Sequence, residues 1–201
     1  MDRLSSIDTL VVSQKKEFGE ILTGFETRNR YVVMDTAGNE LYYAVEQSSA
    51  LLRWFFRALR PFTILIMDLQ GKTVLRLVRP FRFYFHRLDI YDDKDNLLGS
   101  IQKRFSILRR IYSVLDRLGS EIFQLFGSIL TPWTFNIMKG DHEIGKIVKR
   151  WSGLLKEAFT DADNFGVMFP PNLEYMQKAL ILGAVFLIDF VHFERRGNRS
   201  S

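Results

Sequence analysis

The stretch Glu157–Arg196, EAFTDADNFGVMFPPNLEYMQKALILGAVFLIDFVHFERR, decides the fold of this 201-residue chain. An acidic segment leads through a proline pair into the longest apolar run of the sequence, and Ala179–Ile188 contains no polar side chain. Asp189 interrupts the run, which then continues to Phe193. A helix formed here would be apolar on every face, so the architecture depends on what surrounds it.

The length of this run favours a buried helix over a membrane-spanning one. As a helix, the 15 residues Ala179–Phe193 measure roughly 22 Å, whereas a bilayer core is about 30 Å thick and needs about 20 apolar residues. Starting the helix at Leu173 would reach that length but would include Glu174, Gln177 and Lys178. We therefore expect the core helix of a soluble fold, with a transmembrane helix as the alternative.

A recurring turn separates strand-like segments in the rest of the chain. The turn has aspartate first and usually glycine fourth, and it occurs at Asp35–Gly38, Asp68–Gly71 and Asp116–Gly119, with related turns in Asp92–Gly99 and Lys139–Gly145. Aspartate bonds its own backbone in such turns, and glycine supplies a positive φ. The flanking segments read as strands, at Tyr31–Met34, Leu41–Val45, Thr63–Met67, Thr73–Val78 and the alternating run Phe81–His86. Repeated hairpins predict an antiparallel sheet or closed barrel, and a barrel could enclose the C-terminal helix.

One segment shows the spacing of a helix instead of the alternation of a strand. Ile101, Phe105, Leu108, Tyr112 and Leu115 follow helical spacing, so this pattern by itself predicts an amphipathic helix.

Composition indicates a single domain over residues 1–201 with a short flexible tail at 197–201. Hydrophobic residues make up 47% of the chain, and its 18 phenylalanines should supply much of the core. The absence of cysteine excludes a disulfide framework, a thiolate metal site and a cysteine nucleophile. Because Met1–Glu20 lacks an apolar stretch long enough for a signal peptide, we expect a cytoplasmic protein, or one associated with the cytosolic face of a membrane.

Positive charge is concentrated after residue 50. Residues 1–50 carry a net charge of −3 and residues 51–201 a net charge of +8. The predicted binding residues are Lys103, Arg104, Arg109 and Arg110, together with Lys146, Lys149 and Arg150 of the strand-like segment Gly145–Trp151, in which Lys149 should face away from the other two. Such a patch suits anionic phospholipid or nucleic acid, and the alternative is an ordinary solvated basic face.

The segment Asp161–Gly166 is the one candidate metal site. Asp161 and Asp163 occupy positions 1 and 3 of an EF-hand-like loop, but position 5 is Phe165 and position 12 is Asn172 in place of a glutamate. We expect at most weak calcium binding, or a turn that leads to a helix capped by Asn172. The sequence contains none of the nucleophile-elbow, phosphate-loop, dinucleotide or zinc-protease motifs, and nothing in it requires covalent catalysis.

Several of these segments resemble the phospholipid scramblase family. The similarity is greatest in GKIVKRWSGLLKEAFTDADNFGVMFP (145–170) and KALILGAVFLIDFVHFE (178–194), and it extends to NRYVVMDTAGNELYYAVEQSS (29–49), IMDLQGKTVLRLVRP (66–80) and LLGSIQKRF (97–105). The resemblance implies a Tubby-like fold, which is a closed antiparallel β-barrel around a central, buried C-terminal helix. It also implies that residues 101–115 form strands, and we adopt that expectation over the helical one.

The function implied by this resemblance is phospholipid binding, with movement of phospholipid in both directions between leaflets, without ATP and without covalent catalysis. The implied partner is an anionic membrane, and the implied cofactor is calcium, held near 161–172. The cysteine-rich palmitoylation stretch of the family would fall near Phe81–His86, where this chain has no cysteine. The alternative is a soluble Tubby-like module that binds anionic lipid or nucleic acid without transport activity.

Overall fold

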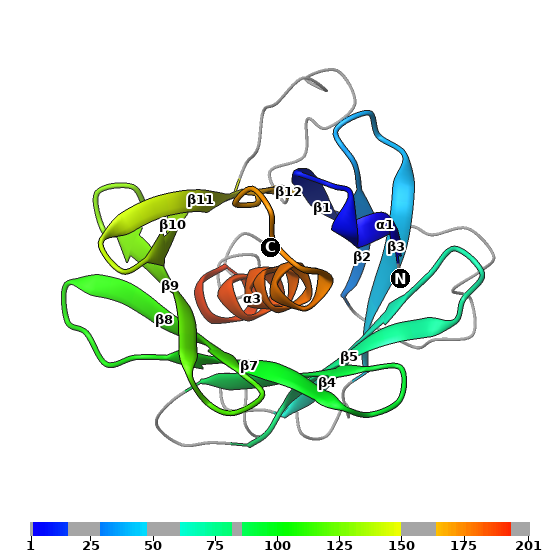
Figure 1. Cartoon of the computed structure of the whole chain (residues 1–201), viewed down its shortest axis with the longest axis horizontal. Helices are drawn as coiled ribbons and strands as arrows, with labels where there is room; N and C mark the ends of the chain where they lie inside the picture. Colours follow the sequence, from blue (N-terminus) through cyan, green and yellow to red (C-terminus); the bar gives the residue numbers. More distant parts are fainter. Residues whose placement is uncertain (1, 16–28, 48–60, 82–85, 150–163, 194–201) are drawn as a thin grey trace, which may run out of the picture.

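The structure, a computed structural model, describes residues 2–15, 29–47, 61–81, 86–149 and 164–193. In this part of the chain 12 strands form a closed antiparallel barrel, in which each strand pairs with its sequence neighbours and β1 pairs with β12 (Figure 1). The strands are β1 (Thr9–Lys15), β2 (Arg30–Met34), β3 (Glu40–Gln47), β4 (Phe62–Met67), β5 (Thr73–Arg79), β6 (Arg87–Asp92), β7 (Leu97–Lys103), β8 (Arg109–Asp116), β9 (Glu121–Ser128), β10 (Thr134–Lys139), β11 (His142–Lys149) and β12 (Asn164–Met168). Residues 82–85 of the expected strand 81–86 lie outside the described part.

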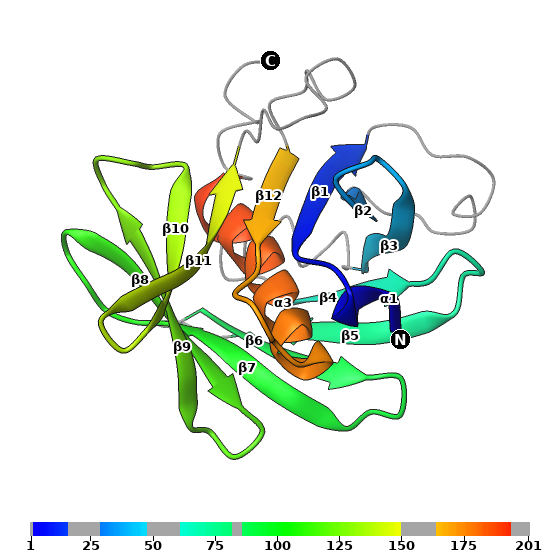
Figure 2. The same cartoon turned by 45° about the horizontal axis from the view of Figure 1, so that its top comes forward.

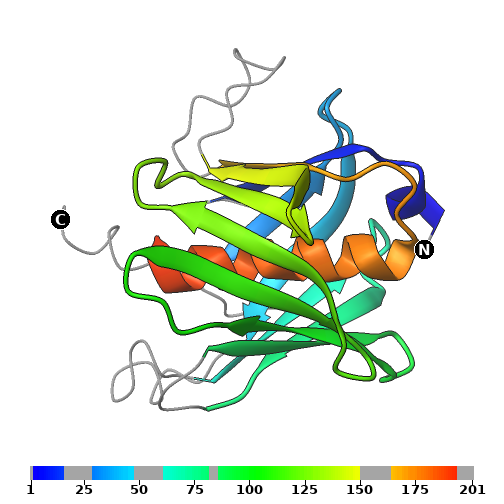
Figure 3. The same cartoon turned by 60° about the vertical axis from the view of Figure 1, so that its left-hand side comes forward.

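The helix α3 (Tyr175–His192) occupies the centre of the barrel, as the apolar run predicts. Figure 2 shows the chain leaving β12 and turning back into α3, and Figure 3 shows α3 running lengthwise between the strands. At 1.5 Å per residue its 18 residues measure about 27 Å. A short helix, α1 (Asp2–Ser5), lies beside its first turn, where the Lys178 ammonium donates to the carbonyls of Ser5 and Ile7 at 2.7 Å each. The expected Tubby-like architecture is confirmed.

Side chains alternate between the two faces of each strand, and the inward-facing ones surround α3. In β10, for example, Phe135 and Ile137 point inward and are buried, while their neighbours are partly exposed. Aromatic contacts join barrel and helix, including Tyr31 with Phe186 at 5.1 Å between ring centroids. Gly183 allows close approach, because a Cβ at this position would lie 3.0 Å from Ile90. The close neighbours here are Ile90 and Leu77.

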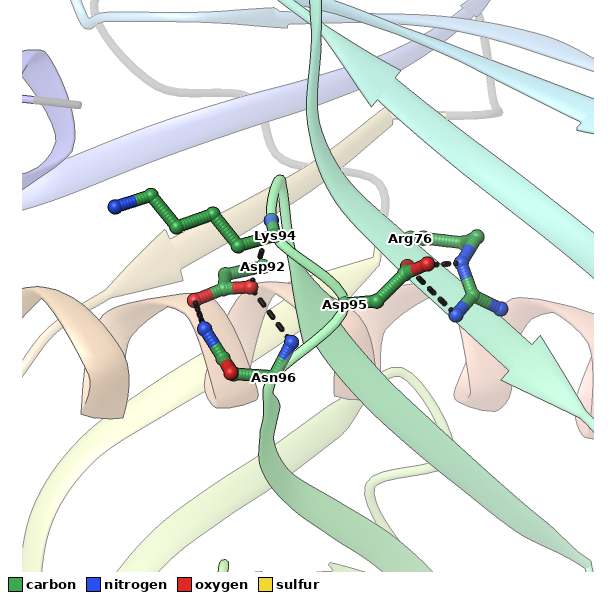
Figure 4. Close-up of polar contacts among 5 residues, drawn as sticks. All are labelled: Arg76, Asp92, Lys94, Asp95 and Asn96. Atoms are coloured by element: carbon green, nitrogen blue, oxygen red, sulfur yellow. Dashed lines mark hydrogen bonds and ion pairs between the residues drawn. The ribbon is translucent and has the colours of Figure 1, made fainter.

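The aspartate turns predicted from the sequence close four of the hairpins with one shared geometry. In the turn between β6 and β7, Oδ1 of Asp92 accepts hydrogen bonds from the backbone N–H groups of Lys94 and Asn96, at 2.9 and 2.8 Å (Figure 4). Asp95 holds the fourth position at φ 62°, where the other three turns have glycine. Equivalent bonds to the second and fourth following residues form at Asp35, Asp68 and Asp116. The recurring sequence pattern is therefore a recurring hairpin.

Two local expectations from the sequence are wrong. The helical spacing in 101–115 does not produce a helix, because Ile101 lies in β7 and Tyr112 in β8, and the loop between these strands carries Phe105 and Leu108. The strands implied by the family resemblance are confirmed. Asn172 does not cap α3 either; it lies in the preceding turn at φ 60°, and the N-cap residue is Glu174, whose N–H donates to Oε1 of Gln177.

The two ends of the barrel differ in their connections. Short hairpins join β2 to β3, β4 to β5, β6 to β7, β8 to β9 and β10 to β11 at the end where α3 begins. The other end, where α3 finishes, is marked by Trp133 stacked on Phe193 at 5.3 Å and by Tyr112 hydrogen-bonded to His192 at 2.8 Å. We call these the hairpin end and the loop end.

Candidate functional site

The predicted basic residues at 103–110 meet on one hairpin at the loop end. Lys103 is the last residue of β7, and Arg109 and Arg110 are the first two of β8. The strands pair so that Lys103 faces Tyr112, and the Arg104 N–H donates to the carbonyl of Ile111 at 2.8 Å. These residues therefore gather at one end of two antiparallel strands, where Arg109 points outward and Lys103, opposite the buried Tyr112, is half-buried.

Each arginine in this group has a different environment. Arg104 pairs with Glu121 at 3.4 Å, and because both side chains are well exposed the pair contributes little stability. Arg109 is exposed, with its guanidinium 5.3 Å from the ring centre of Phe126. Arg110 is half-buried, and its guanidinium donates to the carbonyls of Ser128 at 2.7 Å and Pro132 at 2.8 Å. Arg110 is therefore part of the loop's structure, while Arg109 is placed to meet a ligand.

Exposed apolar side chains flank this basic group, and sequence reasoning missed them. Phe105, Ile107 and Leu108 lie in the loop between β7 and β8, and Ile129 and Leu130 lie in the loop between β9 and β10. Their exposed fractions range from 57% to 92%. The helical interpretation assigned Phe105 and Leu108 to the buried face of a helix, so their exposure was not foreseen. A usable signal was present, since both loops place two adjacent aliphatic residues next to a strand end.

The second predicted group, on β11, divides between the two faces of the barrel wall. Lys146 is half-buried on the outer face, and Arg150 lies outside the described residues. Lys149 faces away from Lys146, as the strand alternation predicted, and its face is the interior of the barrel, where it is 6% exposed. Its assignment as a lipid-binding residue is therefore wrong, because a side chain inside the barrel cannot reach a headgroup at the surface.

Lys149 instead neutralises the one acidic residue of the apolar run. Its ammonium lies 3.0 Å from Oδ1 of Asp189, and the hydroxyl of Tyr31 donates to Oδ2 at 2.9 Å. The ammonium also lies 4.7 and 4.5 Å from the ring centres of Phe165 and Phe193. Moving α3 into lipid would separate these charges, so the network ties the helix to the barrel.

The candidate calcium segment is described only from Asn164 onward, and Asp161 and Asp163 lie outside the described residues. The residues at positions 4 to 8 of the EF-hand-like loop form β12, which is paired on one side with β1 and on the other with β11. An EF-hand loop wraps around its ion, and a strand fixed on both sides cannot do so. No cluster of three or more potential metal-ligating side chains occurs within the described ranges.

One described helix, α3, is long and apolar enough to cross a membrane by length and composition. Buried core helices meet the same criteria, and 72% of this segment is buried in the barrel. Its location in the fold therefore accounts for its apolar character.

Comparison with known proteins identifies the family. The family model named Scramblase matches residues 1–195. Phospholipid scramblase 1 of Mus musculus is 36% identical over 98% of this chain and 65% of its own length. The Homo sapiens phospholipid scramblase 1 is 33% identical, over 99% of this chain and 67% of its own length. The chain thus spans about two thirds of the length of these relatives.

A solved structure shares the fold. The X-ray structure of a protein from Arabidopsis thaliana aligns with a TM-score of 0.56 over 95% of this chain and 96% of its own, at 16% sequence identity. This likeness supports the architecture and carries no information on activity. The barrel around a central helix and the match along nearly the whole chain together place this protein in the phospholipid scramblase family.

Proposed function

We propose that this protein binds anionic phospholipid at the surface of a membrane and moves phospholipid in both directions between the leaflets without ATP. The observation that carries the proposal is the basic group at the loop end, within a chain that belongs to the scramblase family. Each basic residue near an anionic surface contributes about 1 kcal/mol, and the effect fades within a Debye length. Lys103, Arg104 and Arg109 are the primary contacts, and Lys146 and Arg150 are additional ones.

The packed interior limits how lipid can move. Every residue from Ala179 to Asp189 is buried, and the inward side chains of the strands fill the space around α3. A phospholipid headgroup has no route through the centre of such a barrel. We therefore propose that lipid contacts lie on the outer surface and that transport, which is the family's implied activity, proceeds along that surface while α3 stays enclosed.

Sedimentation with vesicles tests the binding step. Wild-type protein should sediment with anionic vesicles at low salt and much less at physiological salt, and it should bind neutral vesicles weakly. Arg109→Glu should weaken binding, whereas Arg117→Glu, which reverses an exposed charge in a turn at the hairpin end, should not. Equal effects of the two substitutions would contradict the assignment. Arg110 is unsuitable for this comparison because it holds the neighbouring loop.

Transport requires a separate measurement. Purified protein is reconstituted into vesicles that contain a fluorescent phospholipid, and a membrane-impermeant reductant is then added outside. Scrambling exposes the inner-leaflet pool to the reductant, so the fluorescence falls further than in protein-free vesicles. If the inner pool stays protected, the protein is a lipid-binding module without transport.

Nucleic acid is a second candidate ligand for the same basic residues. Adding duplex DNA to vesicle-bound protein distinguishes the two ligands. We expect DNA to displace little protein, because phosphate attraction is common to both ligands whereas the exposed apolar side chains favour lipid. Complete displacement by DNA at low concentration would favour the nucleic-acid function.

We further propose that calcium, if it binds through Asp161 and Asp163, does so weakly. The support is chemical, since Phe165 and Asn172 supply no carboxylate and β12 cannot wrap an ion. Calorimetry at low ionic strength should find no submicromolar site. Tight binding that disappears in Asp161→Ala and Asp163→Ala proteins would contradict this proposal.

A further inference from the structure

Exposed apolar residues are strongly biased toward one end of the barrel. Within the described residues, six of the seven exposed large hydrophobic side chains lie at the loop end: Phe81, Phe105, Ile107, Leu108, Ile129 and Leu130. The seventh, Leu118, is 82% exposed in the turn between β8 and β9 at the hairpin end. Single exposed apolar residues are ordinary, but a group confined to one end marks an interaction surface.

The two most exposed loops are neighbours. Arg109 at the start of β8 pairs with Ser128 at the end of β9, so the loop 104–108 emerges beside the loop 129–133. In Figure 3 both loops project on the same side, beyond the red end of α3. We call these two loops the apolar tip.

The second loop of the tip is held in a fixed conformation. The Arg110 guanidinium donates to the carbonyls of Ser128 and Pro132 and lies 4.6 Å from the ring centre of Phe135. Trp133 closes the loop by stacking on Phe193 at the end of α3. Ile129 and Leu130 are therefore presented outward on a braced loop, which lowers the entropy lost on binding.

The charged residues around the apolar tip indicate the chemistry of its partner. Lys103 and Arg109 border the tip, whereas the turns at the hairpin end carry the carboxylates of Asp35, Asp68, Asp92 and Asp116. An anionic surface would attract the loop end and repel the hairpin end. Apolar side chains that project past a basic border match a bilayer interface, where phosphates overlie hydrocarbon.

We propose that the apolar tip inserts into the interface of an anionic bilayer, so that the barrel docks with the C-terminal end of α3 toward the membrane and α3 remains enclosed. This inference rests on the proposed function and assigns the contact to specific loops. Ile107, Leu108 and Leu130 enter the boundary between headgroups and acyl chains. Lys103 and Arg109 lie at the level of the phosphates.

Because the chain has no cysteine, single-cysteine proteins report insertion directly. Ile107→Cys and Leu130→Cys are each labelled with an environment-sensitive fluorophore, and Leu118→Cys, whose exposure equals that of Ile107, is the matched control on the opposite end. Vesicles of phosphatidylserine and phosphatidylcholine should shift the emission of the first two probes toward the blue and leave the third unchanged. A lipid-borne quencher placed at shallow depth should quench the same two probes.

Charge substitutions test the energetic contribution of the tip. Ile107→Asp and Leu130→Asp should each weaken partitioning into these vesicles by about tenfold, while Leu118→Asp should leave it unchanged. Unfolding curves of all three proteins should match the wild type, because the substituted side chains are exposed.

Several outcomes would overturn the inference. In the first, wild-type protein binds the vesicles, but the emission of the probes at 107 and 130 does not shift and neither aspartate substitution weakens partitioning. The protein would then bind lipid through a surface other than the tip. If wild-type protein binds no vesicle, the proposed lipid function fails as well. If the wild type dimerises in sedimentation velocity without lipid, and Ile107→Asp abolishes the dimer, the tip is a protein–protein interface instead.

Discussion

Removing the carboxylate of Asp189 should destabilise the fold more than any surface substitution, because it breaks a buried ion pair with the ammonium of Lys149. The Lys149 and Asp189 side chains are 7% and 9% exposed, and their charged atoms lie 3.0 Å apart. Asp189→Ala removes this ion pair together with the hydrogen bond from Tyr31. Breaking one side of a buried pair costs about 3–5 kcal/mol, which in a domain of this size lowers Tm by about 6–20 °C.

Stability does not require the ion pair itself, so removing both charges at once tests the prediction most directly. Lys149→Met combined with Asp189→Leu removes both charges, so the double variant should recover most of the loss and could exceed the wild type by about 1–4 kcal/mol. The exposed pair Arg104–Glu121 is the control, since Arg104→Gln should change stability by less than about 1 kcal/mol.

Urea unfolding followed by circular dichroism measures these proteins, together with the single variants Lys149→Met and Asp189→Leu that complete the cycle, on one scale. Strong positive coupling in the cycle between residues 149 and 189 is the expected result. The reasoning is refuted if Asp189→Ala costs no more than Arg104→Gln, or if the double variant loses the sum of the two single losses.

Three further predictions concern the helix and the turns. Leu187→Asp should prevent folding, because it places an unpaired charge at a fully buried position, and a soluble protein with a cooperative unfolding transition would contradict this. Gly183→Val should cost about 1–3 kcal/mol in urea unfolding through overpacking against Ile90, and an unchanged midpoint would show that the contact relaxes freely. Hydrogen bonds, first of all that from the Asn39 side chain, lower the pKa of Asp35 below 3.8, so its carboxylate stabilises the folded state above that pH and the contribution is lost as the pH falls through the folded-state value. The Tm difference between wild type and Asp35→Ala should therefore shrink in acid, and a difference independent of pH would count against this role.

Sequence patterns predicted the features that depend on neighbouring residues and missed those that depend on residues far apart in the chain. Aspartate turns were predictable because Asp35 or Asp68 bonds its own next few residues, whatever the rest of the chain does. The segment 101–115 was predicted as a helix on its periodicity alone, because spacing cannot reveal that a loop interrupts it; the resemblance supplied the strands. Alternation predicted that Lys149 faces away from Lys146, but it did not show that this face is buried, and the partner Asp189 is 40 positions away in the chain.

Composition and local pattern were enough to predict a short, largely apolar helix, a series of tight hairpins and an excess of basic residues after residue 50. These properties depend on composition and on neighbours within a few positions, so they can be read without a fold. Tertiary structure decided which basic residues face solvent, which one neutralises Asp189, and which apolar residues stay exposed. The physical reason is that burial and pairing depend on barrel closure, which brings Lys149 to Asp189 and the loop 104–108 beside the loop 129–133.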